Sequence, residues 1–244
     1  MHVLPKGIPR YFCWTRFGTE AAQSVRQILA RKEEERLAGC GVFLWGIGNA
    51  VGRSITRLLH MCDRPQVFFS SVKSPPRMKD VNPPAVVAWR SARGLDGTPF
   101  QMPEQALVIS RYDPAAPRTA HYALVCYSQR PLDSSSTGRQ ITLGALRNLL
   151  TGRPVGTSQV TAVVEYDAER EHRPPVYEVT IEAELVAPYF IRLQDPIPVL
   201  RSLGELSLGE FDFAAVRAEI RRATAGSGPH QLHFALPARN GREH

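Results

Sequence analysis

Short apolar runs bounded by turn-forming residues recur along the chain, and they predict a protein rich in strands. Runs of about four to eight residues with many β-branched and aromatic side chains are typical of strands. We expect strands at 11–17, 42–45, 66–69, 85–89, 105–110, 121–127, 160–165, 177–185 and 190–193. Many short strands with few helices between them indicate an α+β fold with a curled, mixed sheet or barrel.

Helical periodicity is confined to a few segments. The clearest is 20–37, for which Thr19 is the expected N-cap. Its first half places apolar residues on one face, and we expect the charged run Arg31–Arg36 to be a solvent-exposed face. Further helices are expected at 51–61, 142–150 and 213–223, with a helical turn within 197–206.

The chain of 244 residues is long enough to bury a core without disulfides or metals. The proline-rich loop at 73–84 and the loop at 166–175 are too short to be interdomain linkers. We therefore expect one domain, 1–224, followed by a flexible polar tail at 225–244.

Charge narrows the choice of partner. The chain carries 30 Lys and Arg residues against 23 Asp and Glu, a net charge of +7, and arginine far outnumbers lysine. The planar guanidinium suits phosphate recognition, so the composition favours an anionic partner such as nucleic acid. A genome that encodes arginine often is the alternative explanation.

Membrane, metal and cofactor sites are not indicated by the sequence. No run approaches the roughly 20 apolar residues of a membrane span, and the N-terminus lacks the apolar segment of a signal peptide. We therefore expect a cytoplasmic protein with no membrane partner and no cofactor. The cysteines form no C-x-x-C pair, so reduced, mostly buried thiols are expected at Cys13, Cys40, Cys62 and Cys126.

The segment 41–74 carries the most specific chemistry. It reads as an apolar strand, a glycine-rich turn, a short basic helix and a second apolar strand. The indole of Trp45 can stack on a nucleobase, and the amide of Asn49 can read one edge of it. Ser70 and Ser71 end the second strand with small hydroxyls that can line a pocket. A core tryptophan and a turn asparagine are the alternative, which the local pattern by itself favours.

Further binding residues are predicted close to this segment. Trp14 and Trp89 lie in expected strands, and either would form another wall of an aromatic pocket, although burial is the commoner fate of such residues. Basic residues that share a face would contact phosphates, whereas a scattered solvated surface is the alternative. The predicted phosphate-binding residues are Arg53, Arg57, Lys73, Arg77 and Lys79, with Arg90 and Arg93 close by in sequence.

Enzyme chemistry is weakly supported. The turn Gly46–Gly52 does not match the dinucleotide-binding G-x-G-x-x-G pattern, because its third glycine comes one residue late. His60 and His121 have no evident triad partners, and Cys62 follows His60 too closely to indicate a catalytic pair. No catalytic residue and no metal ligand is therefore predicted.

Two of these motifs together resemble a known family. The stretches WGIGNAVGRSITRLL and QVFFSSVKS are similar to the core of EVE domains, relatives of YTH domains in the PUA-like superfamily. Trp45, with the turn that ends at Asn49, matches the first part, and Phe69 with Ser70 or Ser71 the second. The stretch Val176–Leu208 is similar to a later strand of that family and its L-x-x-P-I/V segment. The helix at 20–37 would be an N-terminal insertion.

The resemblance implies a PUA-like pseudo-barrel with flanking helices and a pocket for a flipped, modified base in DNA or RNA. Trp45 would be a pocket wall, and Asn49 with Ser70 or Ser71 would read the edge of the base. We therefore expect a non-catalytic reader domain in a prokaryotic restriction or defence setting, with any cleavage supplied by an effector nuclease on a separate chain. A small hydrolase acting on a modified nucleotide or nucleobase is the alternative, and a plain interaction protein is a third.

Overall fold

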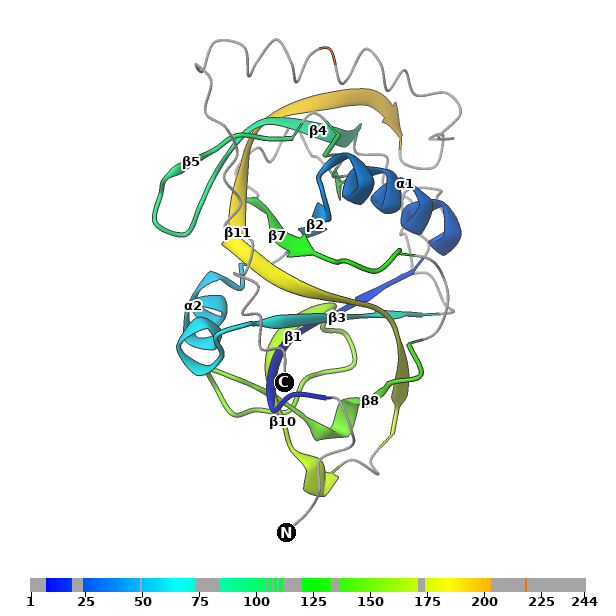
Figure 1. The fold of residues 1–244 in the computed structure, drawn as a ribbon, viewed down its shortest axis with the longest axis vertical. Coiled ribbons are helices and arrows are strands. Elements are labelled where there is room, and N and C mark those ends of the chain that lie inside the picture. The colour runs from blue at the N-terminus through cyan, green and yellow to red at the C-terminus, as the bar shows by residue number, and fades with distance from the viewer. Residues whose placement is uncertain are drawn as a thin grey trace, which may run out of the picture.

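A computed structural model describes 8–18, 24–48, 50–72, 84–103, 105–106, 108, 110–111, 120–132, 137–170, 174–202 and 218. This part of the chain is mixed α+β, with a mostly antiparallel open sheet and two α-helices (Figure 1). The α+β prediction is confirmed at this level. The expected tail at 225–244 and the proline-rich residues 73–83 lie outside the described residues, as does the expected helix at 213–223 apart from the helical Ala218.

The central path of the sheet runs β2–β7–β11–β3–β1–β10–β9. Among the pairings described, β1 with β3 is parallel and the others are antiparallel. The strands of this path are β1 (Tyr11–Phe17), β2 (Val42–Ile47), β3 (Gln66–Ser71), β7 (His121–Tyr127), β9 (Leu146–Asn148), β10 (Thr161–Tyr166) and β11 (Val176–Ser202). The strands off the path are β4 (Pro84–Arg93), β5 (Pro99–Phe100), β6 (Ser110–Arg111) and β8 (Gln140–Thr142).

The long strand β11 curls the sheet. It pairs in turn with β8, β3, β7 and β4, and its register shifts between Leu185 and Phe190 and again after Ile197 (Figure 1). Register shifts bend a strand and increase its twist. The strands expected at 177–185 and 190–193 are therefore one element, and the expected helical turn within 197–206 is wrong as far as Ser202, because the backbone there pairs with β4.

Both helices begin where local capping allows. In α1 (Val25–Ala38) the N-cap is Ser24, which is extended and forms a capping box with Gln27. The sequence predicts that the helix begins at residue 20, but Ser24 is extended and the helix begins at Val25. The expected N-cap, Thr19, lies outside the described residues. The second helix, α2 (Gly52–Met61), matches the prediction and buries Ile55 and Leu58 against the core.

Two local predictions fail, and at the first of them long-range pairing overrides the local pattern. The expected helix at 142–150 is instead a short 3₁₀ turn, Leu143–Ala145, followed by β9, whose backbone pairs with β10. Within the expected strand at 105–110, Gln105 lies in a turn, Ala106 and Val108 are not in a strand, and Ser110 begins the short β6. Residues 107 and 109 lie outside the described residues. In both places the apolar side chains still enter the core, which explains the misleading local pattern.

Among the described residues, buried apolar side chains form three clusters, and each holds one tryptophan. Trp45 belongs to the cluster under α1 and α2, Trp89 to the cluster between β4 and β7, and Trp14 to the cluster beside β9 and β10. Within the described residues, no helix is long and apolar enough to cross a membrane.

Candidate functional site

The two halves of the motif meet at Trp45. Its indole lies edge-on to the ring of Phe69, with ring centroids 4.6 Å apart, and 5.1 Å from the ring of Phe17. Because β1 and β3 are parallel and pair Phe17 with Ser71, their carboxyl ends share one edge of the sheet. Trp45, two residues before the end of β2, therefore packs against residues near the carboxyl ends of β1 and β3. With 7% exposure, its indole offers a base little free face.

Trp14 and Ser70 contact each other in the interior. Both are 0% exposed, and Trp14 Nε1 donates a hydrogen bond of 3.1 Å to Ser70 Oγ. Arg16 lies over the rings of Trp14 and Tyr177 and donates from Nη1 to the hydroxyl of Tyr177. The hydroxyl of Ser70 thus serves a core tryptophan in this structure. Neither residue lines an open surface.

Trp89 lies elsewhere in the fold. It is 3% exposed, and its ring stacks at a tilt on the half-buried His121, 5.0 Å away. Burial lowers the pKa of His121, which favours the neutral imidazole. Since Trp14, Trp45 and Trp89 lie in three separate clusters, the structure does not bring them together around one ligand.

Ser71 remains at the edge where β1 and β3 end. Its backbone N–H donates to Thr180 Oγ1 over 3.2 Å, and Thr180 Oγ1 donates to Ser71 Oγ over 3.0 Å. Ser71 is partly exposed, unlike Ser70. Of the two serines, Ser71 is therefore the one that a ligand at this edge could reach.

The predicted basic residues are placed only in part. Arg53 and Arg57 are exposed on α2, four residues apart and so on one face of the helix. Asn49 and the residues Lys73, Arg77 and Lys79 lie outside the described residues.

The turn after β2 does not build a dinucleotide-binding unit. Such a unit needs two adjacent parallel strands joined by a helix. Here β2 pairs antiparallel with β7, while β3 pairs with β1 and β11, so α2 joins two strands that are not neighbours. The strand order and the glycine spacing in the sequence thus both argue against a dinucleotide-binding site.

The surroundings of Cys62 favour its neutral thiol. Burial, with a smaller contribution from Asp63, raises the pKa of its thiol, which disfavours the reactive thiolate. Its Sγ lies 3.8 Å from the carbonyl oxygen of Tyr11. All four cysteines are free, as expected, but Cys40 is exposed, and burial raises the pKa of Cys13 to about 12. In the part of the chain that the structure describes, no three His, Cys, Asp or Glu residues are grouped to hold a metal ion.

The expectation that the charged run of α1 faces solvent is wrong for Lys32, Glu35 and Arg36, which are buried, whereas Glu34 is exposed. Lys32 and Glu35 are both 3% exposed, and Lys32 Nζ lies 2.6 Å from Glu35 Oε2. The other carboxylate oxygen, Glu35 Oε1, accepts a 2.8 Å hydrogen bond from the backbone N–H of Leu44 in β2. This ion pair therefore ties α1 to the strand that leads to Trp45.

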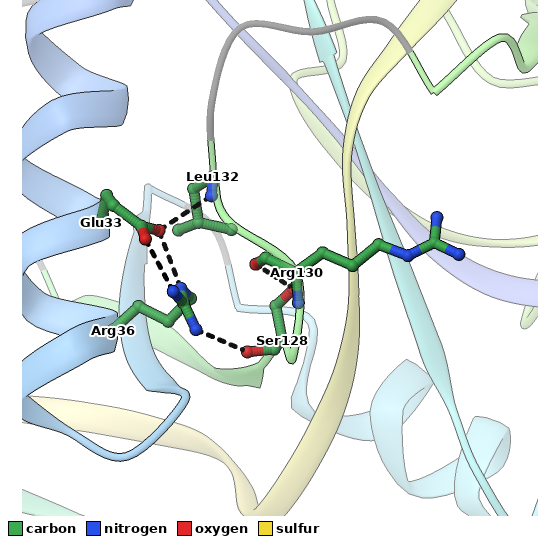
Figure 2. A network of polar contacts seen from close by, with 5 residues as sticks. All are labelled: Glu33, Arg36, Ser128, Arg130 and Leu132. Carbon is green, nitrogen blue, oxygen red and sulfur yellow. Dashed lines mark hydrogen bonds and ion pairs between the residues drawn. The ribbon is translucent and has the colours of Figure 1, made fainter.

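A second set of contacts ties the end of α1 to the segment after β7 (Figure 2). The guanidinium of Arg36 donates two hydrogen bonds to the carboxylate of Glu33, and Arg36 Nη1 donates to the carbonyl of Ser128. The backbone N–H of Leu132 donates to Glu33 Oε2 over 2.8 Å. The side chain of Arg130 points away from this network (Figure 2).

The sequence held a signal for these buried charges. Helical spacing continues from the apolar Ile28 and Leu29 to Lys32, Glu35 and Arg36, so all five share the inward face. The opposite charges are spaced three residues apart, which allows them to pair on that face.

Comparisons of the chain with protein-family models, with curated proteins and with solved structures gave no match. The protein is described by its own structure as a mixed α+β chain with a curled, mostly antiparallel sheet. In this sheet Trp45, near the end of β2, contacts Phe69, near the end of β3, and β3 runs parallel to β1.

Proposed function

We propose that this protein is a non-catalytic reader of a modified, flipped base in nucleic acid, with a PUA-like arrangement of its sheet. The observation that carries the proposal is the contact between Trp45 and Phe69, with ring centroids 4.6 Å apart. It unites the two sequence segments that resemble EVE domains. A base bound at this place would lie beside the turn after β2 and the edge that holds Ser71.

The burial of Trp45 changes its role in the proposal. An indole that is 7% exposed and wedged against Phe17 and Phe69 is suited to supporting the turn after β2. The proposal therefore assigns base contact to residues beyond Trp45, with Asn49 as the edge reader and Ser71 as a neighbouring hydroxyl. Flipping a base costs a few kcal/mol, which hydrogen bonds from Asn49 and Ser71 to the base would help to offset.

Positive charge supports a nucleic-acid partner. The net charge is +7, and Arg53 and Arg57 are exposed on the helix that follows the turn. Phosphate contacts of this kind make affinity fall with salt concentration.

The test is a binding screen of modified and unmodified oligonucleotides at two salt concentrations. The proposal expects at least one modified strand to bind more tightly than its unmodified counterpart, and Asn49→Ala to abolish that preference without lowering the melting temperature. Ser54→Ala, on the neighbouring helix, is the matched control. Equal binding of every modified and unmodified strand would overturn the reader function, and turnover of a free nucleoside would favour the hydrolase instead.

A further inference from the structure

Two exposed arginines face each other across neighbouring strands. Arg192 of β11 is directly opposite Arg93 of β4, and both side chains are exposed. Directly opposed residues in an antiparallel pair have Cβ atoms about 5 Å apart, and like charges in such a pair are destabilising. In the described part of the chain neither arginine has an ion pair with a carboxylate.

Nearby carboxylates are already engaged by other groups. Asp195 accepts a hydrogen bond from Ser91 Oγ, and Asp96 accepts one from the backbone N–H of Thr98. Arg93 donates to the carbonyl of Gly97, which holds its guanidinium by the loop between β4 and β5. Neither of these carboxylates forms an ion pair with Arg93 or Arg192 among the described contacts, so both guanidinium groups keep donors for an external anion.

The same row of residues leads to the turn after β2. Arg192 is also opposite Tyr122 of β7, and Tyr122 is opposite Ile47, the last residue of β2. Neighbouring strands lie about 4.8 Å apart, so the row from Ile47 to Arg93 spans about 15 Å. One end of this row adjoins the proposed base-reading turn, and the other carries the arginine pair.

Aromatic and helical groups frame the row. The ring of Tyr122, which is partly exposed, stacks on Phe190 with centroids 5.0 Å apart. A Cβ atom on Gly52, the first residue of α2, would lie 2.9 Å from Leu95 Cδ2 and 3.4 Å from Phe190 Cε1. The side chain of Leu95 thus lies against the start of α2.

We propose that Arg93 and Arg192 bind consecutive phosphates of a single nucleic-acid strand that crosses β4, β11 and β7 toward the turn after β2. Each guanidinium can hold one phosphate by two hydrogen bonds, and the two negative charges offset the repulsion between the arginines. Tyr122 provides a ring on which a neighbouring base can stack. This inference rests on the proposed function, for which it supplies the path of the strand.

The experiment measures the affinity of unmodified single-stranded DNA and RNA 15-mers at several salt concentrations. Arg93→Gln/Arg192→Gln should weaken both about tenfold at low salt, and should reduce the slope of log affinity against log salt by about 1.4, since each lost phosphate contact removes about 0.7. Arg93→Lys/Arg192→Lys should retain the slope because it retains the charge. The melting temperature of Arg93→Gln/Arg192→Gln should not fall, because this variant removes the repulsion between the two arginines.

The matched control is Arg130→Gln/Arg153→Gln, which removes the same charge from two exposed residues elsewhere on the fold. An equal loss in the control, or an unchanged slope in Arg93→Gln/Arg192→Gln, would overturn the strand path. If that slope is unchanged while wild type still prefers a modified base, only the path fails. If the slope falls as expected but no modification is preferred, the path stands and the reader function fails. If wild type binds no strand, both fail.

Discussion

The indole N–H of Trp14 donates its hydrogen bond to the hydroxyl of Ser70, 3.1 Å away, in the interior of the protein. Both residues are members of the set predicted to bind a base, and the structure makes them partners of each other. Ser70 is therefore a structural residue in the described fold, whereas Ser71, one position later, remains partly exposed at the edge of the sheet.

Removing the Ser70 hydroxyl should destabilise the protein. Ser70→Ala leaves the buried indole N–H without its acceptor, and an unsatisfied buried donor costs about 1–3 kcal/mol. Chemical denaturation of wild type and variant measures the loss. In a Trp14→Phe background the same exchange should cost much less, because no donor is left unpaired; an equal cost in both backgrounds would contradict the pairing.

The buried ion pair of α1 should depend on both of its members. Glu35→Gln leaves the charged Lys32 without a carboxylate in the interior, and breaking a buried pair in this way costs about 3–5 kcal/mol. Glu34→Gln, at the exposed position beside it, should change the free energy of unfolding by less than about 0.5 kcal/mol. Similar denaturation midpoints for the two variants would show that Glu35 is not a buried partner.

Stability should also depend on pH through Lys32. Burial, partly offset by Glu35, lowers the pKa of Lys32 to about 8 from the ordinary value of 10.5. Between these two values the unfolded chain binds the proton more strongly than the folded chain, so this residue's contribution to stability rises with pH and is lost as pH falls through 8. The unfolding free energy of wild type minus that of Lys32→Met should therefore increase from pH 8 to pH 10.5.

A matched variant on the same helix checks the sign of that effect. Arg26 is exposed on α1, so Arg26→Met removes a positive charge from the same helix without changing a buried group. The corresponding difference for Arg26→Met should stay flat between pH 8 and pH 10.5. A falling difference for Lys32→Met would contradict a lowered pKa.

Trp45 should be more important to folding than its predicted role in binding implies. Trp45→Ala removes a ring packed between Phe17 and Phe69, and large-to-small changes of this kind cost about 3–5 kcal/mol. Trp45→Phe retains much of the contact and should cost clearly less. Thermal unfolding of both variants measures this, and equal, small shifts would mean that the indole is not a core side chain.

Much of the fold could be predicted where a local pattern and a long-range partner agree. β1, β7 and α2 match their predictions closely. β1 and β7 are short, almost continuous apolar runs, as is typical of strands buried on both faces, and the apolar residues of α2 have helical spacing. The region of β9 could not be predicted in this way. Its apolar residues suit a short helix as well as a strand, and pairing with β10 decides between them.

The features of the candidate site likewise separate into those set by local sequence and those set by long-range pairing. The sequence by itself determined that Trp45 and Phe69 belong to strand ends joined by a glycine turn and a basic helix, since these are local properties of composition and spacing. Only the tertiary structure decided that the three tryptophans occupy separate clusters, that Glu35 bonds the backbone of Leu44, and that Arg93 lies opposite Arg192. Periodicity reports which residues share a face, but the groups that cover that face come from segments distant in the chain, and their register is set by strand pairing.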